Sequence, residues 1–112
     1  MELIATHDPS GTLLVRLNEA HLDAGNVKDF REAIAPWLER HGHIVFDMSV
    51  LRFVDSSGLG ALIACQRQVH RQRGDFKLCA MSRPVCALFE LMRMHRVFSI
   101  HETREEAVRA FA

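Results

Sequence analysis

The stretch of sequence with the clearest chemical potential holds two adjacent serines next to a carboxylate and two glycines. It reads Asp55-Ser56-Ser57-Gly58-Leu59-Gly60. Asp and Ser often cap the first turn of a helix, where unpaired amide donors and a partial positive charge are exposed. A phosphate on a hydroxyl could be held there without unfolding the chain. Gly58 and Gly60 have no side chains, so another molecule could approach the hydroxyl closely.

The same residues also have a purely structural interpretation. Asp55, Ser56 and Ser57 are ordinary capping residues, and the glycines could serve close packing, so local preferences alone favour a capped turn. A serine hydrolase is not indicated, because its nucleophile stands between two glycines in the order GxSxG. The sequence also lacks the phosphate-binding motif GxxxxGK[ST] and the kinase signatures. We therefore expect a protein that is not an enzyme.

Histidines and cysteines are weaker candidates for chemistry. His41 and His43 flank Gly42, but two such ligands without nearby cysteines or clustered carboxylates make a weak metal site, and we expect none. The three cysteines are odd in number and lack CxxC spacing, which argues against a disulfide framework or a zinc knuckle. They are Cys65, Cys79 and Cys86. Their places in predicted helices and a strand are typical of small buried side chains.

Composition narrows the possible partners. The chain has 112 residues, and its 14 Lys and Arg balance 14 Asp and Glu. Because there is no basic surplus to neutralise phosphates, nucleic acid is not expected as a partner. No apolar run approaches the roughly 20 residues that span a bilayer, and the first residues lack the basic-then-apolar order of an export signal. We expect a cytoplasmic protein without membrane insertion.

Alternating patterns along the chain predict the elements that must position these residues. Short apolar or alternating runs indicate strands, and apolar residues at spacings of three and four indicate helices. The predicted strands are residues 2–6, 11–17, 43–47, 75–81 and 97–101. The predicted helices begin at Asn26, Asp55, Ser82 and Thr103, and Gly42 and Gly74 end the first two. Residues 48–54 are predicted to form a loop that leads into the serines.

The order of these elements predicts a sheet that opens with a hairpin and continues with parallel strands, because helices and strands then alternate. The third helix is expected to bury one apolar face, formed by Val85, Leu88, Phe89 and Met92. Leu91, Met92 and Met94 crowd its end, where core packing is the first interpretation and an exposed apolar contact patch is the alternative.

The serine stretch resembles the phosphorylation-site motif of the STAS domain, and specifically that of bacterial anti-sigma factor antagonists. The resemblance runs from about Leu13 to Phe111 and includes the predicted strand 44–47 and the segment 79–85. The serine motif is its most specific part. The resemblance implies a single STAS domain over residues 1–112, with an α/β fold in which about four helices flank a mixed sheet of four to five strands.

The resemblance also implies a function. In such antagonists the second serine of the motif, here Ser57, is phosphorylated by a cognate anti-sigma factor that is also a serine kinase. The unmodified protein would bind this partner and release the sigma factor, and a serine phosphatase would reset Ser57. The partner binds ATP, so no cofactor is expected here, and the free protein would be a monomer. The implied partner-binding residues are Asp23, Asp55, Ser56, Ser57, Gly58, Leu59 and Gly60.

One loop departs from the family pattern. Where relatives often have Gly-Glu-Leu-Asp, this chain reads Glu19-Ala20-His21-Leu22-Asp23, without the glycine. Partner contacts from this loop stay open, because an aspartate before a helix is more often a solvated or capping residue. The alternative function is that of a STAS scaffold or transporter-associated regulatory subunit without serine turnover.

Overall fold

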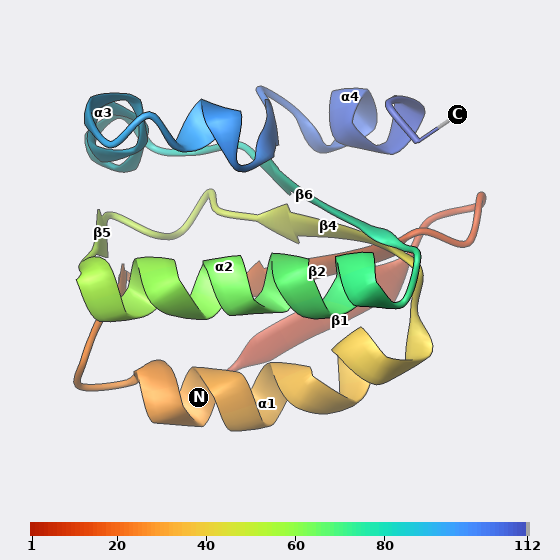
Figure 1. The fold of residues 1–112 in the computed structure, drawn as a ribbon, viewed down its shortest axis with the longest axis horizontal. Helices are drawn as coiled ribbons and strands as arrows, with labels where there is room; N and C mark the ends of the chain where they lie inside the picture. The colour runs from red at the N-terminus through yellow and green to blue at the C-terminus, as the bar shows by residue number, and fades with distance from the viewer. Residues whose placement is uncertain (112) are drawn as a thin grey trace.

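The computed structural model describes residues 1–111 and opens with three strands, after which helices alternate with single strands or, between the first two helices, a pair of strands (Figure 1). The strands are β1 (Leu3–His7), β2 (Leu13–Leu17), β3 (His21–Leu22), β4 (His43–Asp47), β5 (Phe53–Val54), β6 (Asp75–Cys79) and β7 (Ser99–His101). The helices are α1 (Val27–Arg40), α2 (Ser56–Arg71), α3 (Arg83–Leu91) and α4 (Arg104–Arg109), with a short 3₁₀ helix, η1, at Met94–Arg96.

Five strands form the main sheet in the order β1-β2-β4-β6-β7. The hairpin of β1 and β2 is antiparallel, and the other neighbours are parallel. The turn of the hairpin is held by Asp8, whose carboxylate accepts hydrogen bonds from the amides of Ser10 and Thr12. The predicted mixed α/β sheet with its opening hairpin is therefore confirmed.

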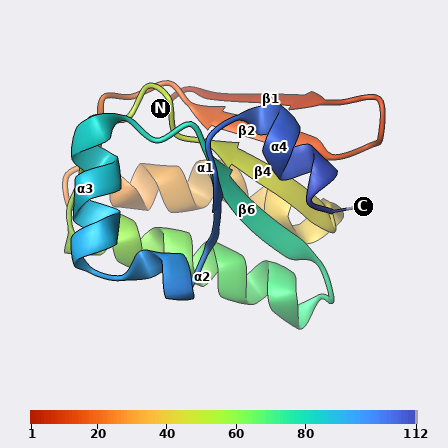
Figure 2. The ribbon, with the colours of Figure 1, turned by 90° about the horizontal axis from the view of Figure 1, so that it is seen from above.

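The two faces of the main sheet are covered differently. In β4, Ile44 and Phe46 enter the main core, whereas Val45 packs on the opposite face with Cys79 and Ala107. Alternate strand residues point to opposite faces, so this short apolar run serves two cores at once. Figures 1 and 2 show α1 and α2 together on one side of the sheet and α4 on the other.

Helix α1 shows why the apolar spacing predicted it correctly. Its buried residues Phe30, Ile34 and Leu38 follow one another at four-residue steps and form one face. Asn26 occupies the predicted N-cap position, but its side chain makes no capping hydrogen bond. Instead the Asn26 side chain accepts from the amide of Asp23 and donates to the carbonyl of His21, which fixes the preceding loop.

Several predicted boundaries were wrong. The first two strands are Leu3–His7 and Leu13–Leu17 instead of residues 2–6 and 11–17, and β6 ends at Cys79 instead of residue 81. Residues 48–54 are not all loop, because Phe53–Val54 forms β5 and pairs in parallel with β3 in a separate two-stranded sheet. The last strand begins at Ser99 instead of residue 97, because the amides of Val97 and Phe98 still bond to the carbonyl of Met94 in η1. A two-residue strand has too little periodicity to be recognised without its partner.

The end of α3 also differs from prediction. Val85 and Phe89 are buried as expected, but Met92 is exposed because the helix ends at Leu91. Arg93 then adopts a left-handed backbone with φ 55°, which turns the chain into η1. The helical repeat that placed Met92 on the buried face does not continue that far.

Candidate functional site

Two loops distant in sequence meet at the amino end of α2. The parallel pairing of β3 with β5 places Leu22 beside Val54, so the residues that follow each strand emerge together. The first loop leads through Asp23 into α1, and the second leads through Asp55 into α2. Figure 1 shows the amino ends of both helices at the same end of the molecule. The predicted site residues are thereby brought together.

Asp55 is the N-cap of α2 and also joins the two loops. One carboxylate oxygen accepts the amide of Gly58 at 2.9 Å, and the other accepts the amide of Ala24 at 3.0 Å. These hydrogen bonds, that from Gly58 foremost, lower the pKa of Asp55 below its ordinary value. Asp55 is therefore ionised at neutral pH, and the predicted cap is confirmed.

The two serines occupy the first turn of α2 but differ in exposure. Ser56 is the first helical residue and is exposed, whereas Ser57 is half-buried beside it. Because the Asp55 cap fixes this turn, both hydroxyls stand on rigid backbone. Ser57 keeps part of its surface exposed, and Ser56 presents more.

Gly58 serves the close packing that was the structural interpretation of the glycines. A Cβ atom on Gly58 would lie 2.2 Å from the carbonyl oxygen of Leu22, so the helix touches the backbone of β3 at this point. Gly58 is buried and thus does not open the surface beside the serines. Gly60 does face open space, since a Cβ atom there would meet nothing within 4 Å. Of the two glycines, only Gly60 leaves room for a partner.

The other two predicted contact residues also have structural contacts. Leu59 belongs to the main core and is only 5% exposed, so its side chain faces inward and offers a partner almost no surface. Asp23 is half-buried and accepts the amide of Gly25 at 2.9 Å, and its other carboxylate oxygen lies 3.0 Å from His21 Nδ1. Both residues therefore shape the site, and Asp23 keeps part of its surface exposed.

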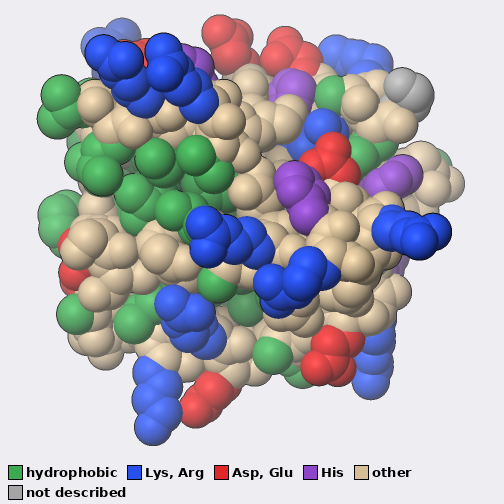
Figure 3. Space-filling view, viewed as in Figure 1, with side chains coloured by type: hydrophobic (Ala, Val, Ile, Leu, Met, Phe, Trp, Pro, Cys, Tyr) green, Lys and Arg blue, Asp and Glu red, His purple; other side chains and the backbone are tan. Residues whose placement is uncertain are grey.

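Apolar side chains lie on the surface near the site. Phe53, two residues before Asp55, is 54% exposed, and Leu91 at the end of α3 is 82% exposed. Met92 and Val97 are exposed as well, whereas Met94 is half-buried. Figure 3 shows hydrophobic side chains gathered on the side of the molecule where α3 and the first half of α2 lie. The alternative interpretation, an exposed apolar patch, therefore holds for Leu91 and Met92.

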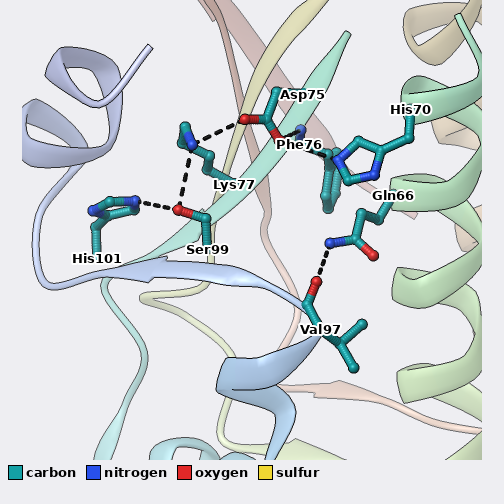
Figure 4. A network of polar contacts seen from close by, with 8 residues as sticks. All are labelled: Gln66, His70, Asp75, Phe76, Lys77, Val97, Ser99 and His101. Atoms are coloured by element: carbon teal, nitrogen blue, oxygen red, sulfur yellow. Dashed lines mark hydrogen bonds and ion pairs between the residues drawn. The ribbon is translucent and has the colours of Figure 1, made fainter. Parts of the chain in front are cut away.

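A second polar cluster lies away from the serines, on the face covered by α4 (Figure 4). Lys77 is buried, and its ammonium lies 3.0 Å from the carboxylate of Asp75 and 3.3 Å from the hydroxyl of Ser99. Ser99 Oγ is 2.7 Å from His101 Nε2. Burial, and secondly the charge of Lys77, lower the pKa of His101 below 6.5. The cluster supplies hydrogen-bond and charge partners to the buried ammonium of Lys77, and it is separate from the serine site.

The cysteines and the sequence-adjacent histidines do not form a reactive centre. Cys65 and Cys79 are buried, and burial raises the pKa of each thiol to about 12. His41 contacts His7, whereas His43 stacks on Phe111 with ring centroids 4.4 Å apart. Across residues 1–111 no three His, Cys, Asp or Glu side chains cluster as metal ligands. In that same part of the chain, no helix has the length and apolarity to traverse a bilayer.

Comparisons with known proteins agree with this architecture. The family model of the STAS domain matches residues 4–107. The anti-sigma F factor antagonist of Paenibacillus polymyxa is 27% identical over 100 residues, which cover 88% of this chain and 85% of that relative.

Solved structures show the same fold. The anti-sigma factor antagonist SpoIIAA in its unphosphorylated form has a TM-score of 0.76 at 23% identity, with 98% of this chain and 96% of that chain covered. The phosphorylated form of SpoIIAA, a Bacillus cell fate determinant, has a TM-score of 0.71 at 22% identity and coverage of 99% and 100%. The murine anion transporter Slc26a9 has a TM-score of 0.69 at 22% identity, over 88% of this chain but 17% of the transporter.

Proposed function

The chain belongs to the STAS domain family, and from this premise we propose that it is an anti-sigma factor antagonist whose binding is switched by phosphorylation of Ser57. The observation that carries the proposal is the position of Ser57, half-buried on the capped first turn of α2 and two residues after the ionised Asp55. The sequence relative from Paenibacillus polymyxa is named as such an antagonist. SpoIIAA, which shares the fold, has been solved in both phosphorylation states.

In the unmodified state, the surface around the serines would bind an anti-sigma factor that is also a serine kinase. Ser56, Ser57 and Gly60 offer a surface with small side chains, and the exposed Phe53 and Leu91 supply apolar area nearby. Burial of such area drives association. The buried side chain of Leu59 supports this surface from below and contributes through the packing of α2. The sigma factor held by the partner would then be released.

Phosphorylation would change the charge of this surface and leave the fold intact. A phosphoserine carries about −1.5 to −2 charges at neutral pH. At Ser57 this charge would stand two residues from the Asp55 carboxylate, which the amides of Gly58 and Ala24 keep ionised. The folded protein tolerates the phosphate, because the amino end of a helix favours negative charge.

Phosphorylation would weaken binding of the partner, because the bound partner would remove water from both negative groups. One buried and poorly paired charge costs several kcal/mol, and every 1.4 kcal/mol is about tenfold in affinity. A loss of about a hundredfold in affinity therefore needs no conformational change. The kinase and its ATP belong to the partner, and a serine phosphatase would restore the unmodified state.

The experiment uses the full chain and a purified anti-sigma factor kinase. Phosphate incorporation is localised by mass spectrometry, and partner affinity is measured by calorimetry. Ser57→Ala is expected to abolish incorporation and keep binding, whereas Ser57→Asp should fold normally and bind about a hundredfold more weakly. Ser56→Asp is the matched control, because it adds the same charge one residue earlier. Phosphate on Ser56, or equal affinity of Ser57→Ala and Ser57→Asp, would contradict the proposal.

Co-purification distinguishes this function from a transporter-associated role. The likeness to the anion transporter concerns the fold alone. A small ATP-binding protein bound to the tagged chain in native cells supports an antagonist. A membrane transporter in its place, together with no phosphate on Ser57, would exclude the antagonist function.

A further inference from the structure

The outward face of α2 continues from the serines toward the other end of the helix. Residues three and four positions apart lie next to each other on a helix surface. This spacing joins Ser56, Gly60, Ala64, Arg67 and Arg71, and none of these five residues is buried. One stripe of α2 therefore carries a serine at its start, two small residues in its middle and two arginines at its far end.

Helix α1 adds a third arginine beside this stripe. Arg31, Ala64 and Gln68 line the same shallow hollow between α1 and α2. Arg31, Arg67 and Arg71 are exposed, and among residues 1–111 none of them has a carboxylate within 4.0 Å. Figure 3, viewed with α2 toward the reader, shows Lys and Arg side chains across the middle of this face. We call Arg31, Arg67 and Arg71 the basic surface.

The positive charge of the basic surface is local and is not offset within the folded chain. Arg67 and Arg71 stand four residues apart on one helix, where like charges repel each other. The chain as a whole has 14 basic and 14 acidic side chains, so this concentration of charge does not follow from a general surplus. Nucleic acid binding draws on many neutralised phosphates, whereas an acidic protein surface needs only a few complementary charges. The basic surface therefore fits an acidic protein better than a nucleic acid.

A protein that binds the serines must also contact the surface around them. A stable interface covers about 800 Å² on each partner, which is a patch roughly 30 Å across. At 1.5 Å per residue, Arg67 lies about 15 Å and Arg71 about 21 Å from Ser57 along α2. Resting on the proposed function, we infer that the anti-sigma factor kinase contacts the basic surface through an acidic segment of its own while its active site engages Ser57.

This second contact has a different role from that of the serine turn. Charges at the rim of an interface speed association, and salt weakens their effect. Both Arg67 and Arg71 lie farther from Ser57 than the Debye length, which is about 8 Å at physiological salt. Phosphate on Ser57 and the basic surface therefore act independently on partner binding. The losses of affinity caused by Ser57→Asp and Arg67→Glu should accordingly multiply in the double variant.

The test measures phosphorylation of the full chain by a purified anti-sigma factor kinase with ATP, and partner affinity by calorimetry. Arg67→Glu and Arg71→Glu should each raise the KM for the chain and weaken binding by about fivefold to tenfold. The kcat should stay nearly constant, because neither arginine is near the reacting hydroxyl. Raising the salt from about 50 mM to about 500 mM should shrink the difference from wild type. Arg109→Glu is the matched control, since Arg109 is exposed on α4, across the sheet from α2.

The possible failures can be told apart. Unchanged KM and affinity in both Arg67→Glu and Arg71→Glu, with Ser57→Asp still binding weakly, would overturn the contact at the basic surface and keep the proposed function. Binding of a nucleic acid duplex that both arginine variants abolish, with kinase affinity unchanged, would also overturn it and assign the arginines to nucleic acid. If the wild-type chain does not bind the kinase, the proposed function fails, and the contact at the basic surface fails with it.

Discussion

The carboxylate of Asp55 accepts the backbone amide of Ala24 at 3.0 Å, across 31 positions of sequence. Its other oxygen caps α2 through the amide of Gly58. One side chain therefore holds the loop that enters α1 against the turn that carries the serines. Both loops of the site therefore depend on this carboxylate.

Substitutions at Asp55 should separate the effect of its capping oxygen from the effect of its negative charge. Asp55→Asn keeps a side-chain oxygen for the N-cap but removes the charge, and Asp55→Ala removes both. We expect Asp55→Ala to lower the free energy of unfolding more than Asp55→Asn in urea titrations. Asp55→Asn should also reduce the effect of phosphate on partner binding, because less negative charge remains beside Ser57. Equal stability of the two variants would show that the cap is unimportant.

Two glycines in α2 make a matched pair for alanine substitution. Gly60→Ala adds a Cβ atom in open space and should raise the free energy of unfolding by about 0.5–1 kcal/mol, because alanine loses less entropy in a helix. Gly58→Ala would force a Cβ atom to within 2.2 Å of Leu22 O. It should destabilise by about 1–3 kcal/mol, as overpacking does. Urea unfolding measures both, and a stable Gly58→Ala would contradict the contact.

The turn after α2 predicts a stabilising substitution. Arg73 has φ 64°, and the amides of Arg73 and Gly74 bond to the carbonyls of His70 and Val69, both at 2.9 Å. This Schellman pattern usually places glycine at the left-handed residue. Arg73→Gly should therefore raise the free energy of unfolding by up to about 1 kcal/mol. As a control, Arg71→Gly inside the helix should lower it, and thermal or urea unfolding distinguishes the two.

His101 should make stability depend on pH. Its pKa in the folded state lies below 6.5, so between these two values the unfolded chain binds more protons than the folded protein. The contribution of His101 to the free energy of unfolding is therefore fully present above pH 6.5, and it is lost as the pH falls through the pKa of His101 in the folded protein. His101→Asn should flatten the pH dependence of urea unfolding, whereas the same change at the exposed His95 should not. Identical pH profiles for wild type and His101→Asn would contradict this.

Because Cys65 and Cys79 are buried, we expect both thiols of the native protein to react slowly with thiol reagents. Burial raises the pKa of Cys65 and Cys79 to about 12, so little thiolate exists at neutral pH and the reagent cannot reach it. Labelling of the native protein, located by mass spectrometry, should reach neither residue before unfolding. The partly exposed Cys86 should label first, although its pKa is also raised, by burial and by Glu90. Fast labelling of Cys79 in native protein would contradict its burial between β6 and α4.

The sequence alone determined most elements of this fold, because their signals are local. The run His43–Asp47 is too short for a helix, and the spacing of Phe30, Ile34 and Leu38 describes one helical face. The capping chemistry of Asp55 and Thr103 is also local, since each side chain bonds an amide three residues later. These features need no knowledge of the rest of the chain.

Tertiary structure decided the features that depend on distant neighbours. Strand β5 exists only because β3 lies beside it, and Gly58 is required where the helix touches Leu22 O. Gly74 was predicted to end α2 by its backbone freedom, yet Arg73 has the left-handed backbone. Gly74 is needed because a Cβ atom there would lie 2.3 Å from Gly42 O. Likewise, no sequence pattern links His7 to His41, because a contact across 34 positions is made by packing and leaves no periodic trace in the chain.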